Sequence, residues 1–147
     1  MAILKPTAAG MVMALLIIIS GCGSDSNPTS GGGGGGGVKT DPSFASDIQA
    51  IFNNRGCSNV GCHAASTASA GLILASGQSY ANLVNVTSTN EPPKKRVVPS
   101  DVANSYLVNK IEGTQTVGGR MPLNATPLGD TEIQNIKNWI SQGAKNN

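Results

Sequence analysis

The stretch NNRGCSNVGCHA, residues 53–64, holds most of the reactive side chains of this 147-residue chain. It contains two of the three cysteines, Cys57 and Cys62, and the only histidine, His63. Two thiols separated by four residues, with an imidazole beside the second, are compatible with a disulfide, a metal site or the covalent attachment of a prosthetic group. The choice among these chemistries depends on the rest of the sequence.

The first 21 residues have the layout of an export signal. A single early cation, Lys5, precedes an apolar run over residues 8–19, and small residues follow. A helix of this run would span about 18 Å, which is short of a hydrocarbon core of roughly 30 Å. The sequence therefore predicts a signal peptide over residues 1–21 and not a membrane span.

The end of this segment, ISGC at residues 19–22, resembles the lipobox of bacterial lipoproteins, whose cysteine is lipidated and becomes the first mature residue. The resemblance implies acylation of Cys22 and stable anchoring in a membrane. Gly23 occupies the position at which an aspartate would retain such a protein at the inner membrane. An outer-membrane anchor is therefore slightly favoured, facing the periplasm or the cell surface. The alternative is an ordinary signal peptide with a chance cysteine.

Residues 22–40 form the predicted linker, with seven consecutive glycines at residues 31–37. A Gly/Ser-rich chain of this length behaves as a random coil with a root-mean-square span of roughly 25 Å. The folded part is expected over residues 41–147, as one domain.

Composition limits what this domain can do. Ten Lys and Arg against eight Asp and Glu give a net charge of +2, without the basic stripe that nucleic-acid binding requires. One Trp, two Tyr and two Phe are few aromatic side chains for a core, because aromatic residues normally dominate core packing. No nucleic-acid partner is expected, and the core is short of bulk.

Apolar residues at helical spacing predict four helices. The segments are residues 44–54, 79–86, 104–113 and 130–143. No stretch alternates with a period of two beside a hairpin signal, and RVVP at residues 96–99 is too short to predict a strand. Long loops over residues 64–79 and 112–130 separate the helices, and loops of this length are often functional. The sequence predicts a small all-α domain.

Three interpretations of the cysteine–histidine segment differ in what they explain. A disulfide between Cys57 and Cys62 suits an exported protein, but it closes a short loop and leaves His63 without a role. Zinc takes four tetrahedral ligands, and the mature chain has no second Cys/His pair to complete such a set. Covalent haem attachment through C-x-x-C-H uses both thiols and the adjacent imidazole. The spacer here is SNVG, two residues longer, and Gly61 gives it freedom to bulge outward.

Met121 is the only methionine of the mature chain, because the other three lie in the signal peptide. It occurs in GGRMPL, residues 118–123, between glycines and Pro122, where no helical period assigns it to a core. A thioether on such a loop suits a second axial ligand of a haem iron. His/Met ligation raises the reduction potential in cytochromes c.

The order helix, Cys–Cys-His, loop, helix, Met-Pro loop and closing amphipathic helix resembles the small monohaem c-type cytochromes, particularly bacterial membrane-attached cytochrome c-like domains. The similarity covers about residues 44–144 and includes RVVPSDVANSYLVNKIEG, GRMPL and EIQNIKNWISQGA. It implies one covalently bound haem c, with Cys57 and Cys62 as attachment cysteines. It also implies His63 as the proximal iron ligand and Met121 as the distal ligand.

The resemblance implies an electron-transfer protein and not an enzyme. An iron with two protein ligands has no open position for a substrate, and the only histidine is used as a ligand. Redox partner proteins and a membrane are the expected partners, and no small-molecule substrate is expected. Two alternatives stay open. One is a haem-based sensor in which Met121 dissociates and a small ligand replaces it. The other is a structural lipoprotein with a Cys57–Cys62 disulfide and no haem.

Two arginines are weaker candidates for the site. Arg96 ends the basic run KKR beside the apolar VVP, so it is expected to be half buried, and Arg120 directly precedes Met121. Either cation would suit a haem propionate, although a short charge run is more often a solvated loop.

Overall fold

The computed structural model describes residues 36–147. The predicted signal peptide over residues 1–21 and the predicted lipidation site, Cys22, lie outside the described residues. The elements are, in order, η1 (Phe44–Ile48), α1 (Gln49–Asn54), η2 (Ser69–Gly71), α2 (Ser79–Leu83), α3 (Tyr106–Glu112) and α4 (Asp130–Ser141). η1 is a π-helical turn that continues into α1, and η2 is a short 3₁₀ turn.

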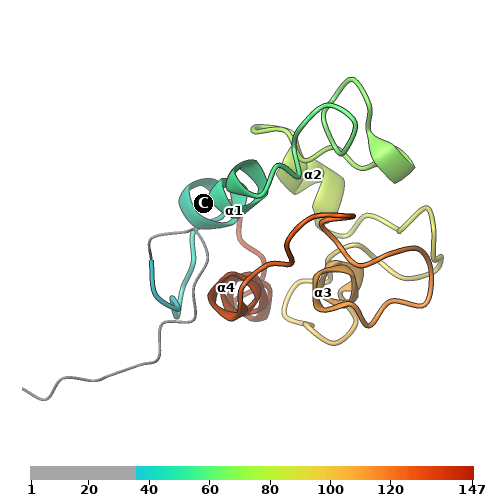
Figure 1. Ribbon diagram of the computed structural model, residues 1–147. Helices are drawn as coiled ribbons and strands as arrows, with labels where there is room; N and C mark the ends of the chain where they lie inside the picture. Colours follow the sequence, from blue (N-terminus) through green and yellow to red (C-terminus); the bar gives the residue numbers. More distant parts are fainter. Residues whose placement is uncertain (1–35) are drawn as a thin grey trace, which may run out of the picture.

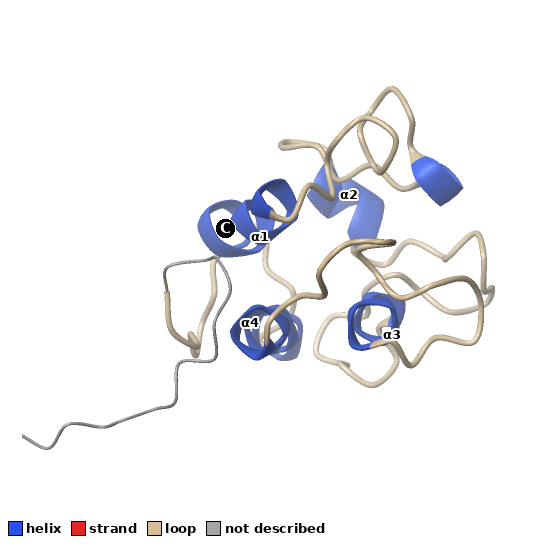
Figure 2. Cartoon of the chain, in the orientation of Figure 1, coloured by secondary structure: helices blue, strands red, loops and turns tan. Residues whose placement is uncertain are grey.

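Helices and long loops make up this part of the chain, with no strand between residues 36 and 147 (Figure 2). Four isolated bridges are the only extended pairings in that range. The described residues therefore form an all-α fold, which confirms the predicted class at that level. None of their helices has the length and apolar character needed to cross a membrane.

The helices occur where the apolar spacing predicts them, and local signals set their ends. α3 ends at Gly113, which has a left-handed φ of 83°, and Thr114 N–H donates back to Asn109 O at 3.0 Å. α2 is shorter than predicted, because Val84 is extended and pairs with Val97 in an isolated bridge. The β-branched residues of VNV favour this extended pairing over a further helical turn.

An aromatic cluster joins the first helical segment to the last. Phe44 lies edge-on to Tyr80 and tilted against Trp139, with ring centroids 5.2 Å apart in each pair. The Trp139 indole N–H donates to Lys145 O and the Tyr80 hydroxyl donates to Ala144 O, both at 2.9 Å. In Figure 1, α1 runs across the view while α3 and α4 are seen end-on. The first helical segment thus crosses and packs against α4.

The remaining core is aliphatic and includes residues from the loops. Ile48 of η1 and both Ile136 and Ile140 of α4 are fully buried. Leu74 and Val97 lie outside the helices and belong to the same buried cluster. Single aliphatic side chains therefore anchor the long loops to the helical frame.

A bidentate ion pair connects the end of α1 with the start of α4. Arg55 Nε lies 2.7 Å from Glu132 Oε1, and Arg55 Nη2 lies 2.5 Å from Glu132 Oε2. Glu132 Oε2 also accepts the N–H of Gly129 at 2.8 Å, which satisfies a free donor at the helix N-terminus. Both side chains are largely buried. The pair fixes the chain two residues before Cys57.

The segment before η1 also lies against α4. Lys39 N–H donates to Asn135 Oδ1 at 2.7 Å, and Asn138 Nδ2 donates to Lys39 O at 2.6 Å. The Lys39 ammonium forms an ion pair with Asp47. Contacts with α4 therefore begin within the stretch predicted as linker.

Replacement of Glu132 by Gln tests the importance of the ion pair. The Arg55 guanidinium would then face a neutral amide in a largely buried position, so we expect the free energy of unfolding to fall by about 2–3 kcal/mol. Urea denaturation followed by circular dichroism measures the loss. Glu112→Gln is the matched control, because its pair with Lys137 is half exposed and should contribute less than about 1 kcal/mol. Equal losses for the two variants would contradict the assignment.

Candidate functional site

The segment after α1 forms a closed turn that gathers the cysteines and the histidine. Cys57 N–H donates to Phe52 O at 2.8 Å, and His63 N–H donates to Cys57 O at 3.0 Å. The second bond brings the two ends of the motif together although four residues separate the thiols. Val60 in the spacer is 79% exposed, so the extra residues project into solvent.

The two thiols differ in their surroundings. Both are free in the structure; Cys57 is half buried and Cys62 is exposed. Burial raises the pKa of Cys57 to about 11, and the nearby Cys62 acts in the same direction. Cys57 also packs against the hydrophobic core. The first thiol is thus held on the frame, and the second points to the surface.

Two backbone carbonyls orient the His63 ring. Its Nδ1 lies 3.1 Å from Ser69 O and 3.2 Å from Leu72 O. Because carbonyl oxygens only accept hydrogen bonds, this pairing assigns the proton to Nδ1 and leaves the lone pair on Nε2. Burial lowers the pKa of His63, although both carbonyls act the other way, and this favours the neutral ring at neutral pH. Metal-ligating histidines commonly carry such a second bond on the nitrogen that does not bind the metal.

The sequence analysis did not identify the two carbonyls that orient His63 or the residues that hold them in place. Ser69 and Leu72 act through main-chain atoms, which leave no trace in side-chain chemistry. Arg96, expected to be half buried, is only 7% exposed, and its Nη2 donates to Ala70 O at 3.0 Å. The only available signal for its burial is its position beside VVP.

The loop that carries Met121 is fastened to α3. Met121 N–H donates to Lys110 O at 2.8 Å, and Arg120 Nε donates to Ile111 O at 2.8 Å. The Lys110 ammonium donates to Gly119 O at 2.6 Å. These bonds place a half-buried methionine beside the C-terminal half of α3.

The predicted site residues thus fall into two groups. Cys57, Cys62 and His63 share one turn, whereas Met121 lies on a separate loop against α3. Lys110 is near both groups: its carbonyl binds Met121 N–H, and its charge adds to burial, the main cause, in lowering the pKa of His63. Within residues 36–147, no group of three His, Cys, Asp or Glu side chains could hold a metal ion. A zinc site requires such a group.

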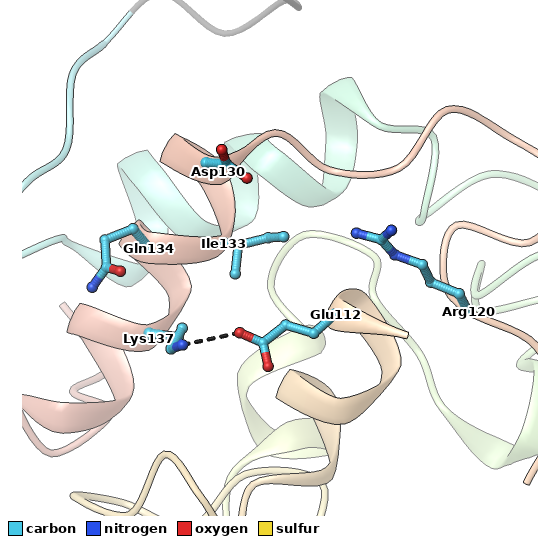
Figure 3. A pocket seen from close by; sticks show the side chains of 6 residues that line it. All are labelled: Glu112, Arg120, Asp130, Ile133, Gln134 and Lys137. Carbon is cyan, nitrogen blue, oxygen red and sulfur yellow. Dashed lines mark hydrogen bonds and ion pairs between the residues drawn. The ribbon is translucent and has the colours of Figure 1, made fainter. Parts of the chain in front are cut away.

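A separate pocket of about 400 Å³ opens between α4 and the end of α3 (Figure 3). Six residues line it: Glu112, Arg120, Asp130, Ile133, Gln134 and Lys137. An ion pair of 2.9 Å joins Lys137 of α4 to Glu112 of α3 at its edge. None of the four predicted haem-site residues lines this pocket.

Comparison of the chain with protein families, curated proteins and solved structures finds no match. A functional assignment therefore depends on the motif and on its geometry.

Alkylation tests the different surroundings of the two thiols in protein whose cysteines are free. With a pKa of about 11, only about one Cys57 in a thousand is ionised near pH 8, so iodoacetamide should label the exposed Cys62 much faster. The Cys57 rate should rise as the pH approaches about 11. Peptide mapping by mass spectrometry gives both rates, and denaturation in urea should make them similar. Similar rates in the folded protein would contradict the assigned burial.

Proposed function

We propose that this chain is a membrane-tethered electron-transfer protein that uses one covalently attached c-type haem. Cys57 and Cys62 would form the thioethers, while His63 Nε2 and the Met121 sulfur would be the axial ligands. The observation that carries the proposal is the His63 ring, held through Nδ1 by two carbonyls beside two thiols. A neutral imidazole with a free Nε2 is the form that binds iron.

The available donors fit this group in kind. Two thiols, a neutral imidazole nitrogen and a thioether are the protein ligands and attachment points of a c-type haem. When bound, the haem supplies a one-electron couple. The chain's own contribution would be to bind the group covalently at the 57–63 turn, to orient the His63 ring and to offer a soft sulfur ligand from the Met121 loop.

The attachment of the Met121 loop favours electron transfer over small-ligand sensing. Hydrogen bonds from Met121 N–H, Arg120 Nε and the Lys110 ammonium hold this loop against α3. A sensor releases its methionine so that a ligand can bind, and such a step requires a loop that moves easily. A fastened loop instead limits rearrangement when an electron arrives or leaves.

The sequence supplies the membrane part of the proposal. A lipidated Cys22 and a linker over residues 22–40 would keep the domain beside a bacterial membrane on the exported side, with the outer membrane slightly favoured. The linker allows the domain to reorient toward its redox partners.

A pyridine haemochrome spectrum combined with the mass of the mature protein tests the cofactor. We expect one haem and two thioether bonds, and Cys57→Ala should leave a single thioether with a shifted haemochrome band. Ser58→Ala, in the spacer between the two cysteines, is the control and should leave both measurements unchanged. A colourless protein with a Cys57–Cys62 disulfide would instead establish the structural lipoprotein.

Replacement of Met121 by Ala tests the distal ligand. We expect loss of the methionine–iron charge-transfer band in the far red, a more negative midpoint potential and new binding of carbon monoxide. The exposed Leu123, two residues further on, provides the control: Leu123→Ala should keep all three properties of the native protein. If the native protein itself binds carbon monoxide and loses the far-red band, the sensor interpretation is favoured.

Replacement of Cys22 by Ser tests the anchor. Without acyl chains the protein should move from the membrane fraction to the soluble exported fraction, because stable attachment requires several buried chains. The mass of the native mature protein should also exceed that of the polypeptide and haem by the acyl groups. A native mature mass without the acyl groups would contradict the lipid anchor.

A further inference from the structure

Arg96 is a buried cation with neutral partners. It is 7% exposed, and none of the ion pairs within residues 36–147 involves it. Its Nη1 donates to Asn82 O at 2.8 Å and its Nη2 donates to Ala70 O at 3.0 Å. Burial lowers the pKa of Arg96, in keeping with the cost of removing a charge from water. Such a residue holds main-chain segments together at an energetic cost that a neutral side chain would avoid.

The loop that Arg96 holds is conformationally strained. Ala68 and Ala70 have φ values of 33° and 53°, in the left-handed region that costs a non-glycine residue roughly 1–2 kcal/mol. Strain of this kind persists only where the surrounding structure imposes it, and it is concentrated at functional sites. Arg96 and Thr89 both contact this strained segment, because the Thr89 hydroxyl donates to the same Ala70 O at 2.9 Å.

The same loop also holds the His63 imidazole. The carbonyls of Ser69 and Leu72 flank Ala70 in sequence, and both accept the Nδ1–H of His63. The orientation of these two carbonyls depends on the left-handed backbone between them. The contacts thus run from the Arg96 guanidinium through Ala70 O to the carbonyls that hold the His63 ring.

We propose that Arg96 is a positioning residue for His63, which fixes the 68–72 loop so that its carbonyls hold Nδ1–H and direct Nε2 toward the iron. The effect on the iron rests on the proposed function, whereas the link between Arg96 and the imidazole does not. Arg96 acts here through its two-pronged geometry, and its charge alone is not sufficient.

The hydrogen-bond geometry and the charge of Arg96 would have opposite effects on the midpoint potential of the haem. The variants must therefore separate these two effects. A weaker Nδ1–H bond makes the imidazole a poorer donor and raises the potential. Loss of a nearby positive charge lowers it. Arg96→Lys keeps the charge but replaces the planar fork by a compact ammonium that does not reproduce both carbonyl contacts. Arg96→Gln removes charge and fork together, and Lys95→Gln removes a neighbouring exposed charge as the control.

The decisive measurement is solvent exchange of the His63 Nδ1 proton in the full-length, haem-loaded ferrous protein by NMR. Because one hydrogen bond contributes about 1 kcal/mol, we expect Arg96→Lys to speed exchange by about fivefold and to raise the midpoint potential. Lys95→Gln should exchange at the native rate. Native exchange in Arg96→Lys, with a lowered potential only in Arg96→Gln, would mean that Arg96 acts as a charge, for instance toward a propionate, and would overturn the proposal.

Thr89→Val keeps the test decisive if the arginine variants do not fold or bind haem. Thr89 is exposed, and this substitution removes the second hydrogen-bond donor to Ala70 O. We expect it to speed exchange of the His63 Nδ1 proton, by less than Arg96→Lys does. Native exchange in this variant would count against the role of the loop. If the native protein is colourless, the proposed function fails, and ¹⁵N spectra of the His63 ring then decide the positioning role. A proton fixed on Nδ1 in native protein but not in Arg96→Lys supports it, and identical spectra overturn it.

Discussion

Phe44 lies between Trp139 of α4 and Tyr80 of α2, and this contact connects segments almost a hundred residues apart in the chain. Most of the intervening chain is irregular, with short helices and long loops. Such loops have little local stability of their own, so their positions depend on the helical frame that the aromatic contact closes. Few aromatic residues are available, and three of them are used at this one position.

Side-chain donors hold two loops near the candidate ligands, the 68–72 loop beside His63 and the loop that carries Met121. At the 68–72 loop, main-chain carbonyls accept hydrogen bonds from the His63 imidazole, from Arg96 and from Thr89. At the Met121 loop, main-chain groups bond to α3, and the Lys110 ammonium adds a further bond. In both cases side chains satisfy polar groups that a helix or sheet would otherwise satisfy. The two loops therefore have defined positions without regular structure.

Apolar spacing predicted the helices because their burial follows a simple period, as Ile136, Trp139 and Ile140 illustrate. The same spacing predicted α2 to be longer than it is, because Val84 pairs with a valine thirteen residues further on. The role of Cys57 and His63 in binding a haem also came from the sequence, and it stays a prediction. The environments of the run KKR were not readable from the sequence: Lys94 pairs with Glu91, Lys95 is exposed and Arg96 is buried. Their different surroundings arise from loops that bear no periodic signal.

The contacts between α4 and Lys39 affect which part of a membrane-anchored domain would be accessible to other proteins. Asn135 accepts a hydrogen bond from the Lys39 N–H, and Asn138 donates one to the Lys39 carbonyl. The domain would therefore rotate relative to its linker at this residue. In Figure 1 the segment at residues 36–43 lies on one side of the domain, and the loop that follows α1 lies on the far side, beyond the helix. For a domain anchored through Lys39, the turn at residues 57–63 would lie at the other end of the first helical segment from the point of attachment. A partner that approaches from the aqueous side would then reach this turn without passing the point of attachment.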